Sequence, residues 1–142
     1  MTSPVSPNLD AFIAARRSMA FEYFSHDCAH IAADWVLECT GRDVLEDLRV
    51  AGGPLERRSL LAALRVVRAA GGFQQAAMQR LGPFLPALMA QRGDVVLALS
   101  GGKVGRVSGY SFGICTGSHI VCPSNECLVF LPLDQGVAAW RV

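Results

Sequence analysis

Apolar residues recur every three or four positions through the first two thirds of the chain, and this spacing predicts helices. Asn8 can cap a first helix, and a second one is expected between the N-cap Asp27 and a stop at Gly41. The second stripe is the clearest, and it puts Cys28 in the first turn of a core-facing helix. The apolar members are Leu9, Phe12, Ile13 and Met19 or Ala20 in the first helix, and Cys28, Ile31, Ala32, Trp35, Val36 and Cys39 in the second.

Further helical stretches follow before the pattern changes. We expect a short helix over residues 43–50, a turn at residues 52–54, a long helix over residues 55–70 and a short helix over residues 73–81. Glycine and proline at positions 82, 83 and 86 then interrupt regular structure. An apolar run lies around these prolines, and we assign it to the core, with a docking surface as the alternative. Its members are Phe84, Leu85, Leu88 and Met89.

From Gly93 onward the pattern changes to short runs that are typical of strands: residues 94–99, 104–107, 110–116, 119–122 and 128–131. Alternation puts the large residues 110, 112 and 114 on one face of the third run and the small residues, Ser111 among them, on the other. Helices followed by strands predict an α+β domain, with N-terminal helices packed on a small antiparallel sheet.

Composition fits one domain over residues 8–142 behind a disordered leader over residues 1–7, since 51% of the 142 residues are hydrophobic and 18% are charged. The 13 basic and 12 acidic residues are spread along the chain, which argues against a nucleic-acid partner. No transmembrane segment or signal peptide is expected. The odd count of five cysteines indicates free thiols. A mean hydropathy of +0.33 is high enough to suggest apolar surface covered by a partner chain.

Cys28 is the most suggestive chemical group in the chain. A cysteine in the first turn of a helix lies near unpaired backbone N–H groups and the positive end of the helix dipole, and both favour the thiolate. Cys28 is therefore a candidate nucleophile. The alternative is a small apolar residue of the core, because free cysteines are among the most buried residue types.

Three motifs occur in a fixed order: Asp27-Cys28 at the start of a helix, the Gly-Asp-apolar run at residues 93–97, and Phe-Gly-Ile-Cys-Thr-Gly at residues 112–117. Together they resemble the nucleophile segment and two strands of NlpC/P60-type cysteine peptidases. The resemblance implies a papain-like fold in which Cys28 holds the nucleophile position. Residues 128–142 are also similar to small phage-encoded proteins found among tail genes.

Two positions depart from the peptidase pattern. The family's general-base histidine directly precedes its second matching strand, and Ser111 stands there in this chain. The family's third polar residue would fall near residues 121–123, where Cys122 is a poor acceptor for an imidazole. Because base catalysis is worth about 10²–10⁴-fold, we expect little or no peptidase activity.

His26, His30 and His119 are the histidines that could replace the lost base. His26 precedes the helix and His30 projects from the side of the helix away from Cys28, so only His119 comes from the strand side, as a base normally would. A Cys28–His119 dyad is thus the hypothesis that restores a hydrolase. The alternative for all three is a surface or hydrogen-bonded structural role.

A different hypothesis is a metal site, since four soft ligands occur within one short stretch. Cys115, His119, Cys122 and Cys127 could bind zinc or an iron–sulfur cluster. Their spacing matches no common zinc-finger pattern, and Cys115 belongs to a strand with apolar neighbours. Core cysteines are therefore the preferred interpretation, and no cofactor is expected.

The resemblance leads to one functional expectation and two alternatives. The expectation is a structural or assembly component of a phage or phage-like tail, near the tail tip, whose partners are other tail proteins and whose location is the virion after synthesis in the host cytoplasm. The first alternative is an active cysteine hydrolase that cleaves peptidoglycan peptides with Cys28 and His119. The second is a metal-stabilised interaction module.

Overall fold

Four α-helices precede five strands in the part of the chain that a computed structural model describes, residues 7–99, 109–124 and 126–142. The expected α+β class is confirmed. The helices are α1 (Leu9–Arg16), α2 (Cys28–Thr40), α3 (Leu60–Ala70) and α4 (Phe73–Leu81). The strands are β1 (Val95–Leu99), β2 (Tyr110–Cys115), β3 (His119–Pro123), β4 (Leu128–Pro132) and β5 (Gly136–Trp140). Short 3₁₀ helices are η1 (Glu46–Leu48), η2 (Ala87–Met89) and η3 (Leu133–Gln135).

The strands form one antiparallel sheet in the order β4-β3-β2-β1-β5. Val95 of β1 pairs with Ile114 of β2 on one side and with Trp140 of β5 on the other. The sequence pattern does not predict β5, because glycine and alanine residues have low strand propensity. They fit here because Ala138 and Ala139 are fully buried against neighbouring elements.

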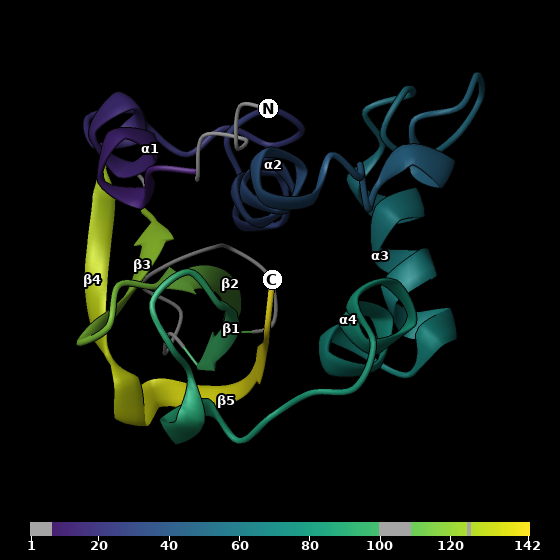
Figure 1. Ribbon diagram of the computed structural model, residues 1–142. Coiled ribbons are helices and arrows are strands. Elements are labelled where there is room, and N and C mark those ends of the chain that lie inside the picture. The colour runs from purple at the N-terminus through teal and green to yellow at the C-terminus, as the bar shows by residue number, and fades with distance from the viewer. Residues whose placement is uncertain (1–6, 100–108, 125) are drawn as a thin grey trace, which may run out of the picture.

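Helices α1 and α2 cover one face of this sheet (Figure 1). The apolar stripe of α2 packs on the large side chains of β1 and β2, and the Trp35 indole N–H donates to the carbonyl of Gly93 at 2.8 Å. Phe12 of α1 meets the Trp35 ring edge-on, with ring centroids 5.2 Å apart. These contacts of Trp35 fix the middle of α2 relative to the sheet and to α1. The buried residues of this layer include Leu9, Phe12, Ile31, Trp35, Val36, Val95, Leu97, Ile114, Val121 and Trp140.

The opposite face of the sheet is built from small residues packed on η2. Cys115, Ile120 and Cys122 are fully buried there beside Ala87. Gly113 is required by this close packing, because a Cβ at that position would lie 2.6 Å from the Cys122 sulfur. The predicted division of β2 into a large face and a small face is confirmed.

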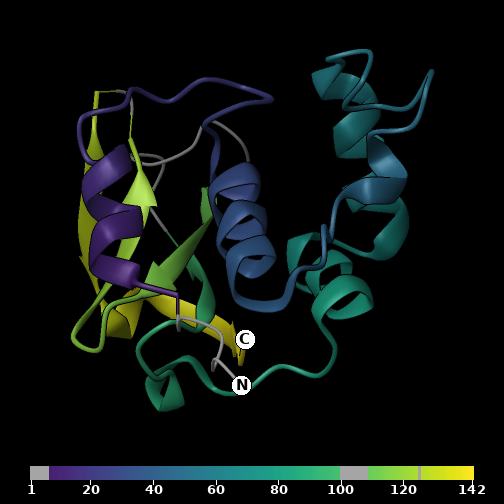
Figure 2. The same ribbon diagram turned by 45° about the horizontal axis from the view of Figure 1, so that its top comes forward.

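The α3–α4 pair lies beyond α2, away from the centre of the sheet (Figure 2). None of the described α3 residues, Leu60 to Ala70, is buried. The pair is tied to the segment after α2 by Arg80, whose guanidinium donates to the Val44 carbonyl at 2.8 Å and to the Asp47 carboxylate at 2.5 and 3.1 Å. Arg42 donates in turn to the Arg80 carbonyl at 2.7 Å.

Several predicted boundaries are wrong. α1 ends at Arg16, before Met19, which is 45% exposed. Residues 43–50 contain only η1 rather than a short α-helix. α3 begins at Leu60 rather than at residue 55, since Ser59 caps it by accepting from the Ala62 N–H at 3.2 Å and Arg58 has a positive φ of 53°.

The assignment of the apolar run around Pro86 to the core is wrong for most of that run. Phe84, Leu88 and Met89 are 41%, 74% and 60% exposed, because the prolines keep the chain extended and η2 buries only Ala87. The predicted strand at 104–107 and most of the expected leader 1–7 fall outside the described residues. Within the described residues, no helix is both long enough and apolar enough to cross a bilayer.

Candidate functional site

Asp27 fixes the start of α2. Its carboxylate accepts from the backbone N–H groups of His30 at 2.8 Å and Phe24 at 2.9 Å, and it lies 2.8 Å from Nδ1 of the His30 ring. Burial alone would raise the pKa of Asp27, but the hydrogen bonds and charge of His30, together with the Phe24 N–H, hold it below its usual value. An ionised N-cap is therefore built directly beside Cys28.

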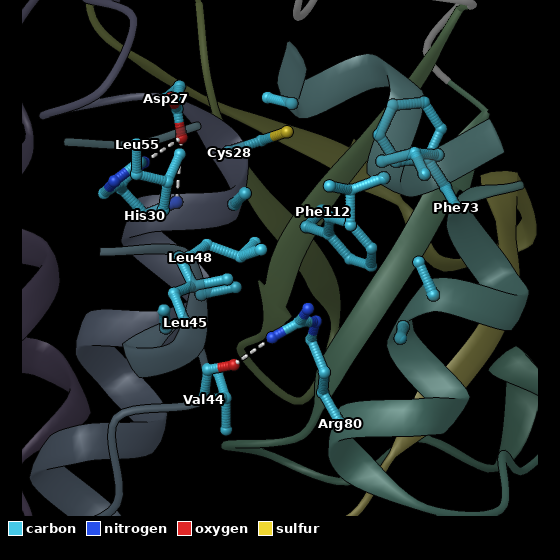
Figure 3. Close-up of a pocket in the computed structure, with 18 of the residues that line it drawn as sticks. Asp27, Cys28, His30, Val44, Leu45, Leu48, Leu55, Phe73, Arg80 and Phe112 are labelled. Carbon is cyan, nitrogen blue, oxygen red and sulfur yellow. Dashed lines mark hydrogen bonds and ion pairs between the residues drawn. The ribbon is translucent and has the colours of Figure 1, made fainter. Parts of the chain in front are cut away.

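Cys28 is half-buried at the first turn of α2, and its sulfur points into a cavity between Asp27 and Phe112 (Figure 3). Burial raises the pKa of the Cys28 thiol, and the Asp27 carboxylate acts in the same direction. The N–H groups of Phe112 and Ala29 and the Ser111 hydroxyl act in the opposite direction without cancelling burial. The activation expected from the helix dipole alone is thus outweighed, and the thiol stays protonated at neutral pH.

Ser111 and Cys122 lie beside this thiol. Ser111 is 1% exposed, its hydroxyl donates to the Phe112 carbonyl at 3.2 Å, and it also interacts with both the Cys28 and Cys122 sulfurs. Burial, with a smaller contribution from Cys28, raises the pKa of Cys122 to about 12. The structure therefore brings Cys28, Ser111 and Cys122 together as two protonated thiols beside one buried hydroxyl.

The three candidate bases are placed elsewhere. His119 is exposed at the beginning of β3, where its Nδ1 lies 2.9 Å from the Ser118 hydroxyl, and three residues of strand, roughly 10 Å, separate it from Cys122. The His30 ring is held by Asp27 on the side away from the Cys28 sulfur (Figure 3). His26 is buried before α2, and within the described residues its Nε2 has no hydrogen-bond partner. No histidine is among the groups that shift the pKa of Cys28.

The four candidate metal ligands are not gathered into a site. Cys115 and Cys122 are buried in the small-residue face of the sheet, whereas His119 and Cys127 are exposed. Across residues 7–99, 109–124 and 126–142, no three His, Cys, Asp or Glu side chains are placed to hold a metal ion. The expected zinc or iron–sulfur alternative therefore has no geometry to support it.

A cavity of about 180 Å³ extends from Cys28 along α2 and toward α3 and α4. Sequence reasoning missed it, because the apolar stripes of α2 and α3 both read as core faces and periodicity does not say whether they touch. The signal in the sequence that could have indicated the cavity is that α2 and α3 both carry an apolar stripe. Residues that line the cavity include Cys28, Val36, Leu64, Val67, Phe73 and Phe112.

Almost the whole chain matches one protein-family model. A family model described as a domain of unknown function (DUF6950) matches residues 3–142. The chain belongs to the DUF6950 family. No curated protein and no solved structure matches it. The family description assigns no activity, so the function is argued from the site itself.

Proposed function

We propose that this DUF6950 protein is a non-hydrolytic structural or assembly component of a phage or phage-like tail, near the tail tip, built on a degenerate cysteine-peptidase-like domain. The observation that carries the non-hydrolytic part is the Cys28 thiol, whose pKa is raised and whose polar side-chain neighbours are Asp27 and Ser111 rather than a histidine. A nucleophilic cysteine needs a thiolate and a base that returns the proton to the leaving group. This site offers neither.

The tail assignment rests on the resemblance of the three motifs and of residues 128–142 to phage-encoded proteins. An assembly role is further supported by the exposed apolar side chains of Phe84, Leu88 and Met89, which we call the η2 patch. Exposed apolar side chains within one short segment of the chain are typical of protein–protein contact sites. Other tail proteins are the partners that this proposal requires.

The first experiment measures iodoacetamide alkylation of each cysteine as a function of pH, with peptide mapping. Cys127 is exposed and serves as the internal reference. We expect Cys28 to react only at a higher pH than Cys127, because burial disfavours its thiolate. A Cys28 that reacts with an apparent pKa well below about 8.5, and that loses this reactivity in His119→Ala, would instead establish the hydrolase.

The second experiment tests the assembly role by complementation of a particle that lacks the protein. Cys28→Ser and Cys28→Ala should restore particle formation, whereas Leu88→Asp in the η2 patch should not. Leu61→Asp is the matched control, since Leu61 is 63% exposed on α3, away from the patch. Purified particles without the protein, or equal assembly with Leu88→Asp and Leu61→Asp, would contradict the proposal.

A further inference from the structure

The cavity beside Cys28 has a defined shape. It is lined along α2 from Cys28 to Val36, eight residues apart, which corresponds to a length of about 12 Å at the rise of an α-helix. The cavity is therefore elongated along α2, with a volume of about 180 Å³.

Its walls come from all the layers that surround it. Phe112 of β2 and Phe73 of α4, whose ring centroids lie 6.1 Å apart, line it together with Val36 of α2 and the stripe of α3, with Leu64 and Val67 (Figure 3 draws part of this lining). None of the described α3 residues is buried, although the apolar face of this helix is turned toward the cavity. A bound ligand would bury this apolar face of α3 and thereby stabilise the folded protein.

The acidic and basic side chains of the lining are already paired. Asp27 accepts from His30 and Phe24, and Arg80 donates to Val44 and Asp47. The Cys28 thiol is protonated and carries no charge at neutral pH. A ligand with a charged group inside the cavity would lose its hydration, and the acidic and basic side chains of the lining, already engaged, would not compensate for it.

From this shape and chemistry we infer that the cavity binds the alkyl chain of a single-chain amphiphile, such as a fatty acid or fatty alcohol, with its polar head at the mouth. Comparison with the apolar cavity of about 150 Å³ that binds benzene indicates that the volume suffices for an alkyl chain of modest length. The extent of the lining along α2, from Cys28 to Val36, favours a linear chain over a compact ring.

The test is thermal unfolding of the full chain with 1-butanol, 1-hexanol and 1-octanol, and with 1,6-hexanediol as the matched polar probe. A ligand that binds only the folded state raises the unfolding temperature. We expect about fourfold tighter binding per added methylene, until the chain fills the cavity, and no stabilisation by the diol. Equal effects of 1-hexanol and 1,6-hexanediol, or no dependence on chain length, would overturn the inference.

Two variants of α3 locate the binding. Ala63 lines the cavity, whereas Ala69 is exposed on the same helix outside it. Ala63→Leu should fill the cavity and abolish the effect of 1-octanol, and Ala69→Leu should retain it. Equal octanol binding by both variants would place the alcohol elsewhere and refute the site.

Cysteine protection keeps the inference testable if Ala63→Leu does not fold. In the unmodified protein, 1-octanol should slow alkylation of Cys28 severalfold at a pH where both thiols react, and should leave Cys127 unaffected. Unchanged alkylation of Cys28 at saturating octanol would count against the site. The inference goes beyond the proposed function and does not depend on it, since alkyl binding can fail while Cys28 remains inert, and can succeed in a protein that is absent from tails.

Discussion

His26 is buried before α2 with its Nε2 left without a hydrogen-bond partner among the described residues. Burial lowers the pKa of His26, and the positive charge of Arg16 lowers it further, against smaller opposing effects of Asp27, Asp34 and Glu22. A buried neutral imidazole that must take up a proton in acid is a source of pH-dependent stability.

We predict that His26 makes the fold less stable as pH falls below about 6.5. The folded-state pKa lies below the unfolded value, so the stabilisation is complete above the unfolded pKa and is lost as pH falls toward the folded one, with a slope of at most about 1.4 kcal/mol per pH unit. Urea unfolding of the wild type and of His26→Asn between pH 7.5 and 5 measures this. Identical slopes for the two proteins would rule it out.

Ser111 has a separate effect at the residue scale, because its hydroxyl lowers the pKa of the Cys28 thiol against the larger effect of burial. Ser111→Ala should therefore lower the alkylation rate of Cys28 at a fixed pH by roughly fivefold, for a hydrogen bond worth about 1 kcal/mol. Ser118→Ala is the control, since the Ser118 hydroxyl contacts only His119 among the interactions described. A faster reaction in Ser111→Ala would show that access, not thiolate formation, limits the rate.

At the scale of elements, the N-cap of α2 is the contact most easily tested. Asp27→Ala removes the acceptor for the His30 and Phe24 N–H groups and should lower the free energy of unfolding by about 1–2 kcal/mol. Asp27→Asn keeps a capping oxygen and should cost less. Because the pKa of Asp27 is lowered in the folded state, the difference in stability between the wild type and Asp27→Asn, measured by urea unfolding, should shrink as pH falls below about 4. A constant difference down to pH 2 would contradict this.

Sequence patterns are sufficient for elements whose local signals agree. α2 has an N-cap, a single apolar stripe and a C-terminal glycine with a φ of 75°, and its predicted bounds are confirmed. The predicted bounds of α4 are confirmed as well. The predicted start of α3 is wrong because residues 55–58 form turns, with Arg58 at a positive φ, and Ser59 caps the helix. β5 escapes prediction because its small residues are held by pairing with β1 rather than by their own preference.

The candidate site also has parts that local sequence signals predict and parts that depend on long-range pairing. Cys28 can be singled out from helix spacing, and Ser111 and Cys122 from short motifs. Their proximity depends on the pairing of β2 with β3, which no local pattern specifies. The same pairing puts His119 at the far end of β3, beside Pro132 of β4, so the histidine that the sequence favours as a base is remote from the thiol.

For the whole molecule, the junction between the α3–α4 pair and the rest combines the packing of Ala77 beside Val95 and Trp140 with the polar contacts of Arg80. Arg80 joins this pair to the segment after α2 through Val44 and Asp47. Arg80→Ala should speed amide hydrogen exchange in α3 and α4 about tenfold, the effect of roughly 1.4 kcal/mol expected for a charged hydrogen bond, and leave exchange in β1 and β2 unchanged. Arg65→Ala, on an exposed face of α3, is the control. Faster exchange throughout the sheet would mean that the pair opens only with global unfolding.

The place of β5 also affects how the chain is made. β1 lies between β2 and β5, and its residues Val95 to Ala98 are almost fully buried, yet β5 and the buried Trp140 follow β4 in synthesis. When β1 to β4 have left the ribosome, β5 has not yet been released. The edge of β1 that will pair with β5 is then open, and Trp140 does not yet cover it. Open strand edges pair readily with other chains. The interval between translation of β1 and of β5 is thus the period in which a chaperone would matter most.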